Sequence, residues 1–353
     1  MKQMIGRGNA LMKLDFFEDF ATVTDAKSFM RPASNITELW QTEEKRRLIQ
    51  LWSMTAGADA PTFSDYDQFA ALCSMMPMLV GHTAERHCKF FLKEYYDCTL
   101  PIDEEHCEEI WHMIAEELLH EPRSVADLFH SNRRGIKWLL WERELPSKPF
   151  PKGLVPMLSA KMLMEKTAPD WESWKHEADR VANDFSMLGC QRVYVCVPNG
   201  YTFSTPSLYA VERALTAKKR SFEDDCVLLS QTVRYLCALC IARGWKLFLS
   251  VDQNANESLA LLEYCEKAVG LPSICWKTAC VEAIDAMVAF SCRAHHSPCT
   301  PVFCASDYPS DAELRAALDA YAARYPLGLL QFASGGELID SAAELSRLRD
   351  LLA

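Results

Sequence analysis

Lys246-Leu247-Phe248-Leu249-Ser250-Val251 is a short and nearly unbroken apolar run, and Arg192-Val193-Tyr194-Val195-Cys196-Val197 is another. Between them lies the longer stretch Phe222–Arg243, whose apolar residues recur with helical spacing and which Gly244 follows. Parallel strands give continuous apolar runs because helices cover them, and each parallel pair needs a long crossover connection. We therefore predict a strand, a helix and a second, parallel strand here.

The same alternation continues on both sides of this unit. Gly189 and Gly270 follow two further helical patterns at the position where a left-handed residue ends a helix. A doubly wound sheet and an eight-stranded barrel both fit this order of elements. The other predicted strands are Ile136–Trp141, Leu154–Leu158, Pro301–Ala305 and Gly328–Ala333, and the other predicted helices are Trp171–Leu188, Glu257–Val269, Cys280–Arg293 and Asp311–Tyr325.

The first part of the chain has a different pattern. Ser64-Asp65 and Asp103-Glu104-Glu105 are helix-start signals, and each precedes apolar residues at helical spacing. We predict an N-terminal segment with the first strand over residues 1–40 and a helical insertion over residues 41–134. The remaining strand and helix units then occupy residues 135–353.

The composition narrows the class of protein. The chain has 353 residues, 49% of them hydrophobic, and a formal net charge of −11, which is typical of a globular protein and argues against a nucleic-acid or anionic-membrane surface. The 15 cysteines are scattered through apolar segments, so we expect buried, reduced thiols and a cytoplasmic location. The sequence has only 13 glycines, and they form no nucleotide-binding fingerprint.

Three polar clusters have simpler structural interpretations. We assign Cys237 and Cys240 to core packing, and His295-His296 with Cys292 and Cys299 to a solvated loop. We assign His106, His112 and His120, with their neighbouring glutamates, to a charged helix surface. The spacing in each cluster fits these assignments better than it fits a metal site.

Several short sequence segments, in the same order along the chain, resemble those of the uronate isomerases. This is a divergent family of amidohydrolase-superfamily barrels that interconvert aldose and ketose uronic acids. The best-matching segment is Asn35-Ile36-Thr37-Glu38-Leu39-Trp40, and weaker sequence matches extend over nearly the whole chain. The resemblance implies a TIM-barrel-like (β/α) barrel with an inserted helical lobe. Further matching segments are Lys45-Arg46-Arg47, Ser64-Asp65-Tyr66-Asp67-Gln68-Phe69, Tyr95-Tyr96, Glu108-Glu109-Ile110-Trp111, Arg243-Gly244-Trp245 and Gln331-Phe332-Ala333-Ser334-Gly335.

The departures from the family pattern concern its metal site. The family ends its first strand with a His-x-His metal pair, and counting back from Asn35 places Asp19-Phe20-Ala21 there. Asp19 keeps a carboxylate that can ligate a metal, whereas Ala21 cannot. The family's histidine on the fifth strand falls on Ser250, and its arginine after the third strand falls near Ser159. The closing eighth strand, with its aspartate, is expected to be absent, which predicts a barrel incomplete at the last strand.

The ends of the predicted strands supply the candidate site residues, because the loops at the carboxyl ends of barrel strands form the active sites of such folds. Asp252, Glu142 and Arg143 are the catalytic candidates. Two more, His82 and Arg86, lie in the segment that shapes the substrate pocket in the resembling family. The full set of substrate-binding candidates is His82, Arg86, Asn199, Ser250 and Asp307, and no metal ligand is predicted apart from Asp19.

Two functions remain open. The first is a barrel that has lost the family's metal site, needs no cofactor, and binds a sugar acid or acts as a partner of another protein. The second is an active aldose-ketose isomerase of a uronic acid such as D-glucuronate or D-galacturonate, with a rebuilt site that uses a carboxylate base, Arg143 and, in one form, a divalent metal such as zinc. Because an absent eighth strand leaves sheet edges unpaired, we also expect a homo-oligomer or a protein partner, and no membrane or nucleic-acid partner.

Overall fold

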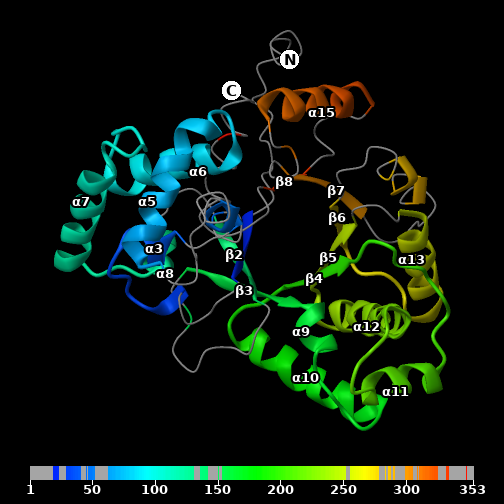
Figure 1. Cartoon of the computed structure of the whole chain (residues 1–353). Helices are drawn as coiled ribbons and strands as arrows, with labels where there is room; N and C mark the ends of the chain where they lie inside the picture. The colour runs from blue at the N-terminus through cyan, green and yellow to red at the C-terminus, as the bar shows by residue number, and fades with distance from the viewer. Residues whose placement is uncertain are drawn as a thin grey trace.

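The computed structural model describes residues 19–23, 29–40, 45, 47–51, 63–130, 136–141, 150, 153–251, 255–277, 283, 285–287, 289–290, 299–304, 308, 310–324, 331–333 and 347. Within them, eight parallel strands form one sheet in the order of the sequence (Figure 1). The strands are β1 (Asp19–Val23), β2 (Ile136–Trp141), β3 (Val155–Ser159), β4 (Arg192–Val197), β5 (Lys246–Val251), β6 (Ile274–Lys277), β7 (Cys299–Cys304) and β8 (Gln331–Ala333).

The expectation of a missing eighth strand is wrong. The sequence analysis overlooked β6, a strand of only four residues, and therefore counted Gln331–Ala333 as the seventh strand rather than the eighth. Strand pairing runs continuously from β1 to β8, and in the described residues it does not close β8 onto β1. The eighth strand is therefore present, but in the described residues β1 and β8 are not paired with each other, and the prediction of an oligomer stays a prediction.

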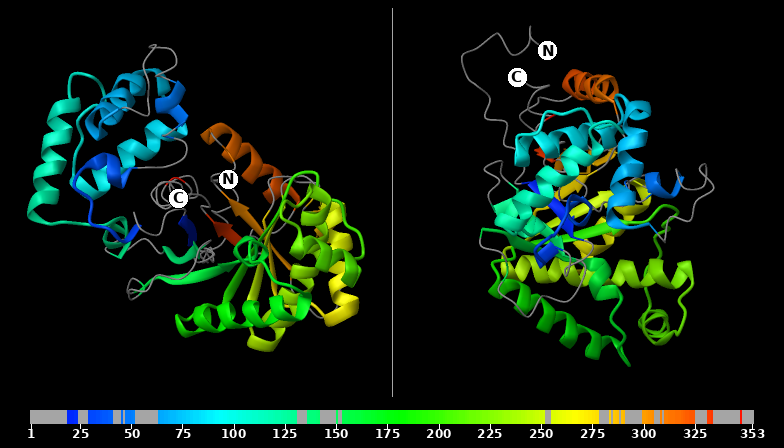
Figure 2. Two further views of the ribbon diagram at one scale, coloured as in Figure 1. Left: turned by 60° about the horizontal axis from the view of Figure 1, so that its bottom comes forward. Right: turned by 60° about the vertical axis from the view of Figure 1, so that its left-hand side comes forward.

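Helices cover the outside of the sheet (Figures 1 and 2). The clearest sequence signals for these helices are the residues that cap their ends. In α12, Ser221 and Asp224 form a reciprocal capping box at the start, and Gly244 ends the helix at a φ of 65°. α12 is long and apolar enough to cross a membrane, but most of it is buried against β4, β5 and neighbouring helices, as in a core helix. The helices are α9 (Ala160–Met164), α10 (Trp171–Met187), α11 (Leu208–Thr216), α12 (Phe222–Arg243), α13 (Ala255–Val269) and α15 (Asp311–Arg324).

A helical lobe is inserted between β1 and β2, as predicted (Figure 1). Its centre is Trp40, whose ring lies 5.9 Å from that of Phe69 and 5.6 Å from that of Phe91. The lobe joins the barrel where Phe29 meets Trp141 edge to face at 6.1 Å. Its elements are α3 (Ile36–Leu39), α5 (Asp65–Met75), η2 (Met76–Leu79), α6 (Thr83–Tyr96), α7 (Cys107–His120) and α8 (Val125–His130).

Alternate residues of the strands face two separate cores. One set packs outward against the helices, and the other packs inside the curve of the sheet. Inside, Tyr194 stacks on Phe248 at 5.5 Å, and the guanidinium of the buried Arg192 lies 4.2 Å from the ring centre of Trp138. The inner core consists of Trp138, Leu140, Met157, Phe248, Cys275 and Val302, with Val155 and Tyr194 packed against it.

The cysteines largely follow the sequence prediction. Among the eleven cysteines whose side chains the structure describes, no two are joined by a disulfide, and all are buried except Cys196. Cys237 and Cys240 lie in the core, as expected, and burial raises the pKa of the Cys190 thiol to about 11. Buried thiols of this kind are unreactive near neutral pH, so Cys196 differs from the rest by its exposure.

Candidate functional site at the mouth of the barrel

The inner face of the barrel ends in polar residues at the carboxyl ends of four strands. Because side chains alternate along a strand, the residue two positions after an inner-core residue faces the same way. Ser159 follows Met157 on β3, Cys196 follows Tyr194 on β4, Ser250 follows Phe248 on β5 and Lys277 follows Cys275 on β6. We call Ser159, Cys196, Ser250 and Lys277 the mouth residues.

Three of the mouth residues form one row across the sheet. Cys196 is the register partner of Ser250, and Ser250 is the register partner of Lys277. Neighbouring strands lie about 4.8 Å apart, so the backbones of Cys196 and Lys277 are separated by roughly 10 Å. Lys277 lies on the same inner face as the other two, and a lysine side chain is long enough to span much of that distance.

The four mouth residues differ in their exposure to solvent. Ser159 and Ser250 are 1% and 3% exposed, Lys277 is half-buried, and Cys196 is exposed. Solvent thus reaches the inner face at β4 while the two hydroxyl groups are covered. The mouth is open on one side and has a cation and two serines around it.

The chemistry of these groups suits an anion that also carries hydroxyl groups. An ammonium donates three hydrogen bonds and accepts none, whereas a serine hydroxyl both donates and accepts. Over the described ranges, no three His, Cys, Asp or Glu side chains lie together in a way that could hold a metal ion. Among the described mouth residues, Lys277 carries a positive charge, and Ser159 and Ser250 each carry a hydroxyl group.

A fixed turn follows β4 beside the mouth. The amide of Tyr201 donates to the carbonyl of Pro198 at 3.1 Å, and Gly200 adopts a φ of 79°. The Tyr201 side chain is fully buried, its hydroxyl lies 2.7 Å from Ser230 Oγ, and burial raises its pKa. These contacts hold the exposed Asn199 at the same edge of the sheet as the mouth residues.

The predicted site residues fall into three groups. Ser250 is one of the mouth residues, and Asn199 lies in the turn beside them. The catalytic candidates Glu142 and Arg143, which follow β2, and Asp252, which follows β5, lie outside the described residues. Asp307, which follows β7, also lies outside the described residues.

His82 and Arg86 lie in the helical lobe. His82 is exposed and caps α6, because its Nδ1 accepts a hydrogen bond from the amide of Ala84 at 3.2 Å. Arg86 is half-buried one turn further along the same helix. Nothing in the described contacts brings either side chain to the mouth residues.

The placement of Asp19 differs from the expectation. It was aligned with a metal pair at the carboxyl end of the first strand, but it is the first residue of β1, which ends at Val23. Four residues of strand, at about 3.3 Å each, put it roughly 13 Å from that end. Counting back from Asn35 assumed the family's loop length, which this chain does not keep.

The sequence analysis missed Cys196 and Lys277. Apart from the positions taken from the family resemblance, it searched for site residues after the strands, whereas these two lie within them on the inner face. Alternation identifies Cys196, because Tyr194 and Cys196 share the face opposite Val193, Val195 and Val197. Lys277 could not be found without β6.

The comparisons with known proteins agree with this architecture. No protein-family model matches the sequence, and no curated protein sequence matches it. The crystal structure of uronate isomerase from Thermotoga maritima superposes with a TM-score of 0.70 at 13% sequence identity and covers 97% of this chain and 87% of its own. Glucuronate isomerase from Caulobacter crescentus gives a TM-score of 0.67 at 11% identity, with 96% and 85% covered. The chain therefore has the fold of the uronate isomerases.

Proposed function

We propose that the chain binds a sugar acid at the mouth of the barrel and does not carry out metal-dependent isomerisation. The observation that carries the proposal is the row of Cys196, Ser250 and Lys277 on the inner face at the carboxyl ends of β4, β5 and β6. In it, Lys277 pairs with the carboxylate of the ligand, and the serine hydroxyls bond the hydroxyl groups of the sugar. The two solved proteins that share the fold are named as isomerases of uronates, which are sugar acids.

Binding without turnover follows from the residue at position 250. The family resemblance implies a histidine on the fifth strand, whereas this chain has a serine on the inner face of β5. A serine hydroxyl lacks the metal-binding nitrogen of an imidazole and does not take up a proton near neutral pH. The competing function is an active isomerase with a rebuilt site that uses Glu142, Arg143 and Asp252.

Proton NMR in D₂O separates the two functions. D-glucuronate and D-galacturonate are each incubated with the protein, with and without zinc, and compared with zinc alone. We expect saturation transfer from the protein to the sugar acid, an unchanged C2 proton signal and no ketose resonances. Loss of the C2 signal or formation of a ketose would establish the active isomerase instead. If saturation is transferred from the protein to neither sugar acid, the binding proposal is overturned.

A further inference from the structure

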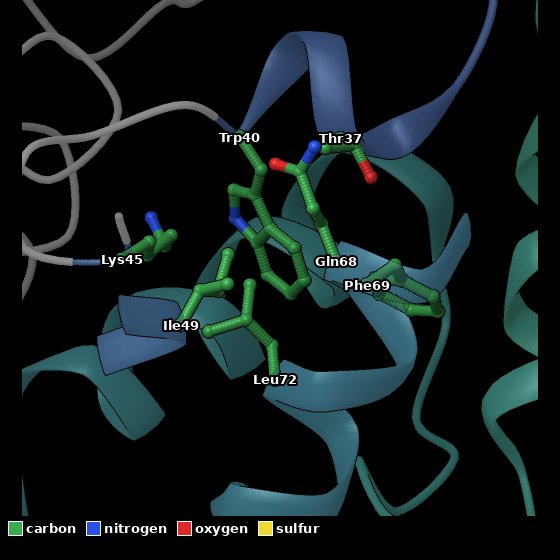
Figure 3. Close-up of a pocket in the computed structure, with 7 residues that line it drawn as sticks. All are labelled: Thr37, Trp40, Lys45, Ile49, Gln68, Phe69 and Leu72. Atoms are coloured by element: carbon green, nitrogen blue, oxygen red, sulfur yellow. The ribbon is translucent and has the colours of Figure 1, made fainter. Parts of the chain in front are cut away.

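The helical lobe contains a small cavity that is separate from the barrel mouth (Figure 3). Its volume is about 10 Å³, which holds one group the size of a water molecule. Trp40, Ile49 and Leu72 are among its lining residues, and none of the mouth residues is. This cavity cannot hold a sugar acid, so it does not compete with the mouth as the ligand site.

Cys196 differs from the other described cysteines in being exposed to solvent, and it lies on the inner face at the mouth. It is in no disulfide bond. A cysteine sulfur is a strong nucleophile toward a carbonyl carbon, and addition requires access to the sulfur rather than a thiol without other contacts. A ligand in the mouth that carries an aldehyde therefore lies beside a group that can add to it.

Two buried hydroxyl groups lie on the strands either side of Cys196. Ser250 on β5 is its register partner, so their backbones are about 4.8 Å apart, and Ser159 on β3 pairs with Tyr194, one inner-face position earlier on β4. Ser159 and Ser250 are 1% and 3% exposed, and neither side chain makes a hydrogen bond in the part of the chain that the structure describes. Because a buried hydroxyl group without a partner is unfavourable, these two groups point to a polar ligand atom beside Cys196.

The order of groups along the row matches that of an open-chain uronic acid. Cys196 and Lys277 occupy the two ends of the row, and Ser250 lies between them. An open-chain aldose uronic acid has its aldehyde at one end, its carboxylate at the other and hydroxyl groups between them. With the carboxylate beside Lys277, as in the proposed function, the aldehyde lies toward Cys196.

We propose that Cys196 binds the sugar acid covalently and reversibly, by adding its sulfur to the aldehyde carbon of the open-chain form to give a thiohemiacetal. The bond between Sγ and C1 forms, the electron pair of the carbonyl π bond moves to the oxygen, and the thiol proton is transferred to that oxygen. Nothing is oxidised or reduced, and reversal releases the aldehyde. Ser250 donates a hydrogen bond to the same oxygen as negative charge develops on it. The inference rests on the proposed function, because the sugar acid must first occupy the mouth.

The test follows D-glucuronate labelled with ¹³C at C1, with a phosphine as the reductant so that no small thiol competes. In a thiohemiacetal C1 carries one sulfur and one oxygen, and its signal lies upfield of the ring anomeric signals, in which C1 carries two oxygens. We expect this signal with the unaltered protein and its loss in Cys196→Ser, which still binds D-glucuronate by saturation transfer. No such signal with the unaltered protein, or an equal signal with Cys196→Ser, would overturn the inference.

Two serine variants test the hydrogen bond to the new hydroxyl group. Ser250→Ala is expected to lower the ratio of thiohemiacetal to non-covalent complex about two- to tenfold, the effect of one hydrogen bond. Ser74→Ala makes the same change on α5 in the helical lobe, where Ser74 Oγ donates to the carbonyl of Ala70, and should leave the ratio unchanged. An equal ratio in Ser250→Ala and the unaltered protein would overturn the role of Ser250.

Methyl β-D-glucuronide separates the covalent step from binding itself. It carries the carboxylate, but its C1 is locked in the ring and cannot form an aldehyde. Saturable binding of the glucuronide together with a thiohemiacetal signal from D-glucuronate is the expected result. If the glucuronide binds and D-glucuronate gives no thiohemiacetal, the covalent step fails and the proposed function stands. If neither sugar acid binds, both fail.

Discussion

Replacing Trp276 by alanine is expected to lower the free energy of unfolding by about 3 to 5 kcal/mol, the range for large aromatic residues removed from a core. Trp276 is fully buried on the outer face of β6 and belongs to the main core. Its indole Nε1 is buried without a partner, which places the expected loss toward the lower end of the range. Denaturant unfolding followed by circular dichroism measures the change.

The control for this prediction is Met187→Ala. Met187 is 85% exposed at the end of α10, so its removal should change the free energy of unfolding by no more than about 0.5 kcal/mol. Equal losses for the two variants would show that β6 does not hold Trp276 in the core. That result would also remove the structural basis for Lys277 as a mouth residue, because the same strand carries both.

Replacing Lys277 by methionine is expected to weaken sugar-acid binding by about 10-fold to 150-fold. A hydrogen bond to a charged group contributes about 1.5–3 kcal/mol, and each 1.4 kcal/mol corresponds to a factor of about ten in affinity. Methionine keeps the length of the side chain but cannot pair with a carboxylate. Titration of the unaltered and variant proteins with D-glucuronate, monitored by NMR or calorimetry, gives the two dissociation constants.

Lys246→Met is the matched control for Lys277→Met. Lys246 is exposed at the opposite, amino end of β5, so its replacement makes the same change in net charge away from the mouth. We expect its affinity for D-glucuronate to equal that of the unaltered protein. If both variants lose affinity equally, the effect is one of overall charge, and Lys277 does not contact the ligand.

The strand and helix order could be predicted from the sequence because its signals are local. Apolar runs such as Arg192–Val197 and helix stops at Gly189, Gly244 and Gly270 lie next to the elements that they define, and all three glycines adopt a positive φ. β6 was missed because Ile274–Lys277 has four residues, which is too short for a run or an alternation to be distinctive.

The site could be predicted only in part because it depends on register between distant strands. Ser250 was found through the family resemblance, and Asn199 through its position after a strand. The row of Cys196, Ser250 and Lys277 requires the pairing of β4, β5 and β6, which no local pattern specifies. Asp19 was misplaced for the same kind of reason, since its position depended on the length of an irregular connection.

A comparison of D-glucuronate with D-glucose is the most direct test of the proposed site. The two sugars differ at C6, where one has a carboxylate and the other a hydroxymethyl group, so the difference in affinity isolates recognition of the carboxylate. We predict that D-glucuronate binds saturably to the unaltered protein and that D-glucose binds at least about tenfold more weakly. Equal affinity for the two sugars, or no binding of either, would contradict a sugar-acid site at the mouth of the barrel.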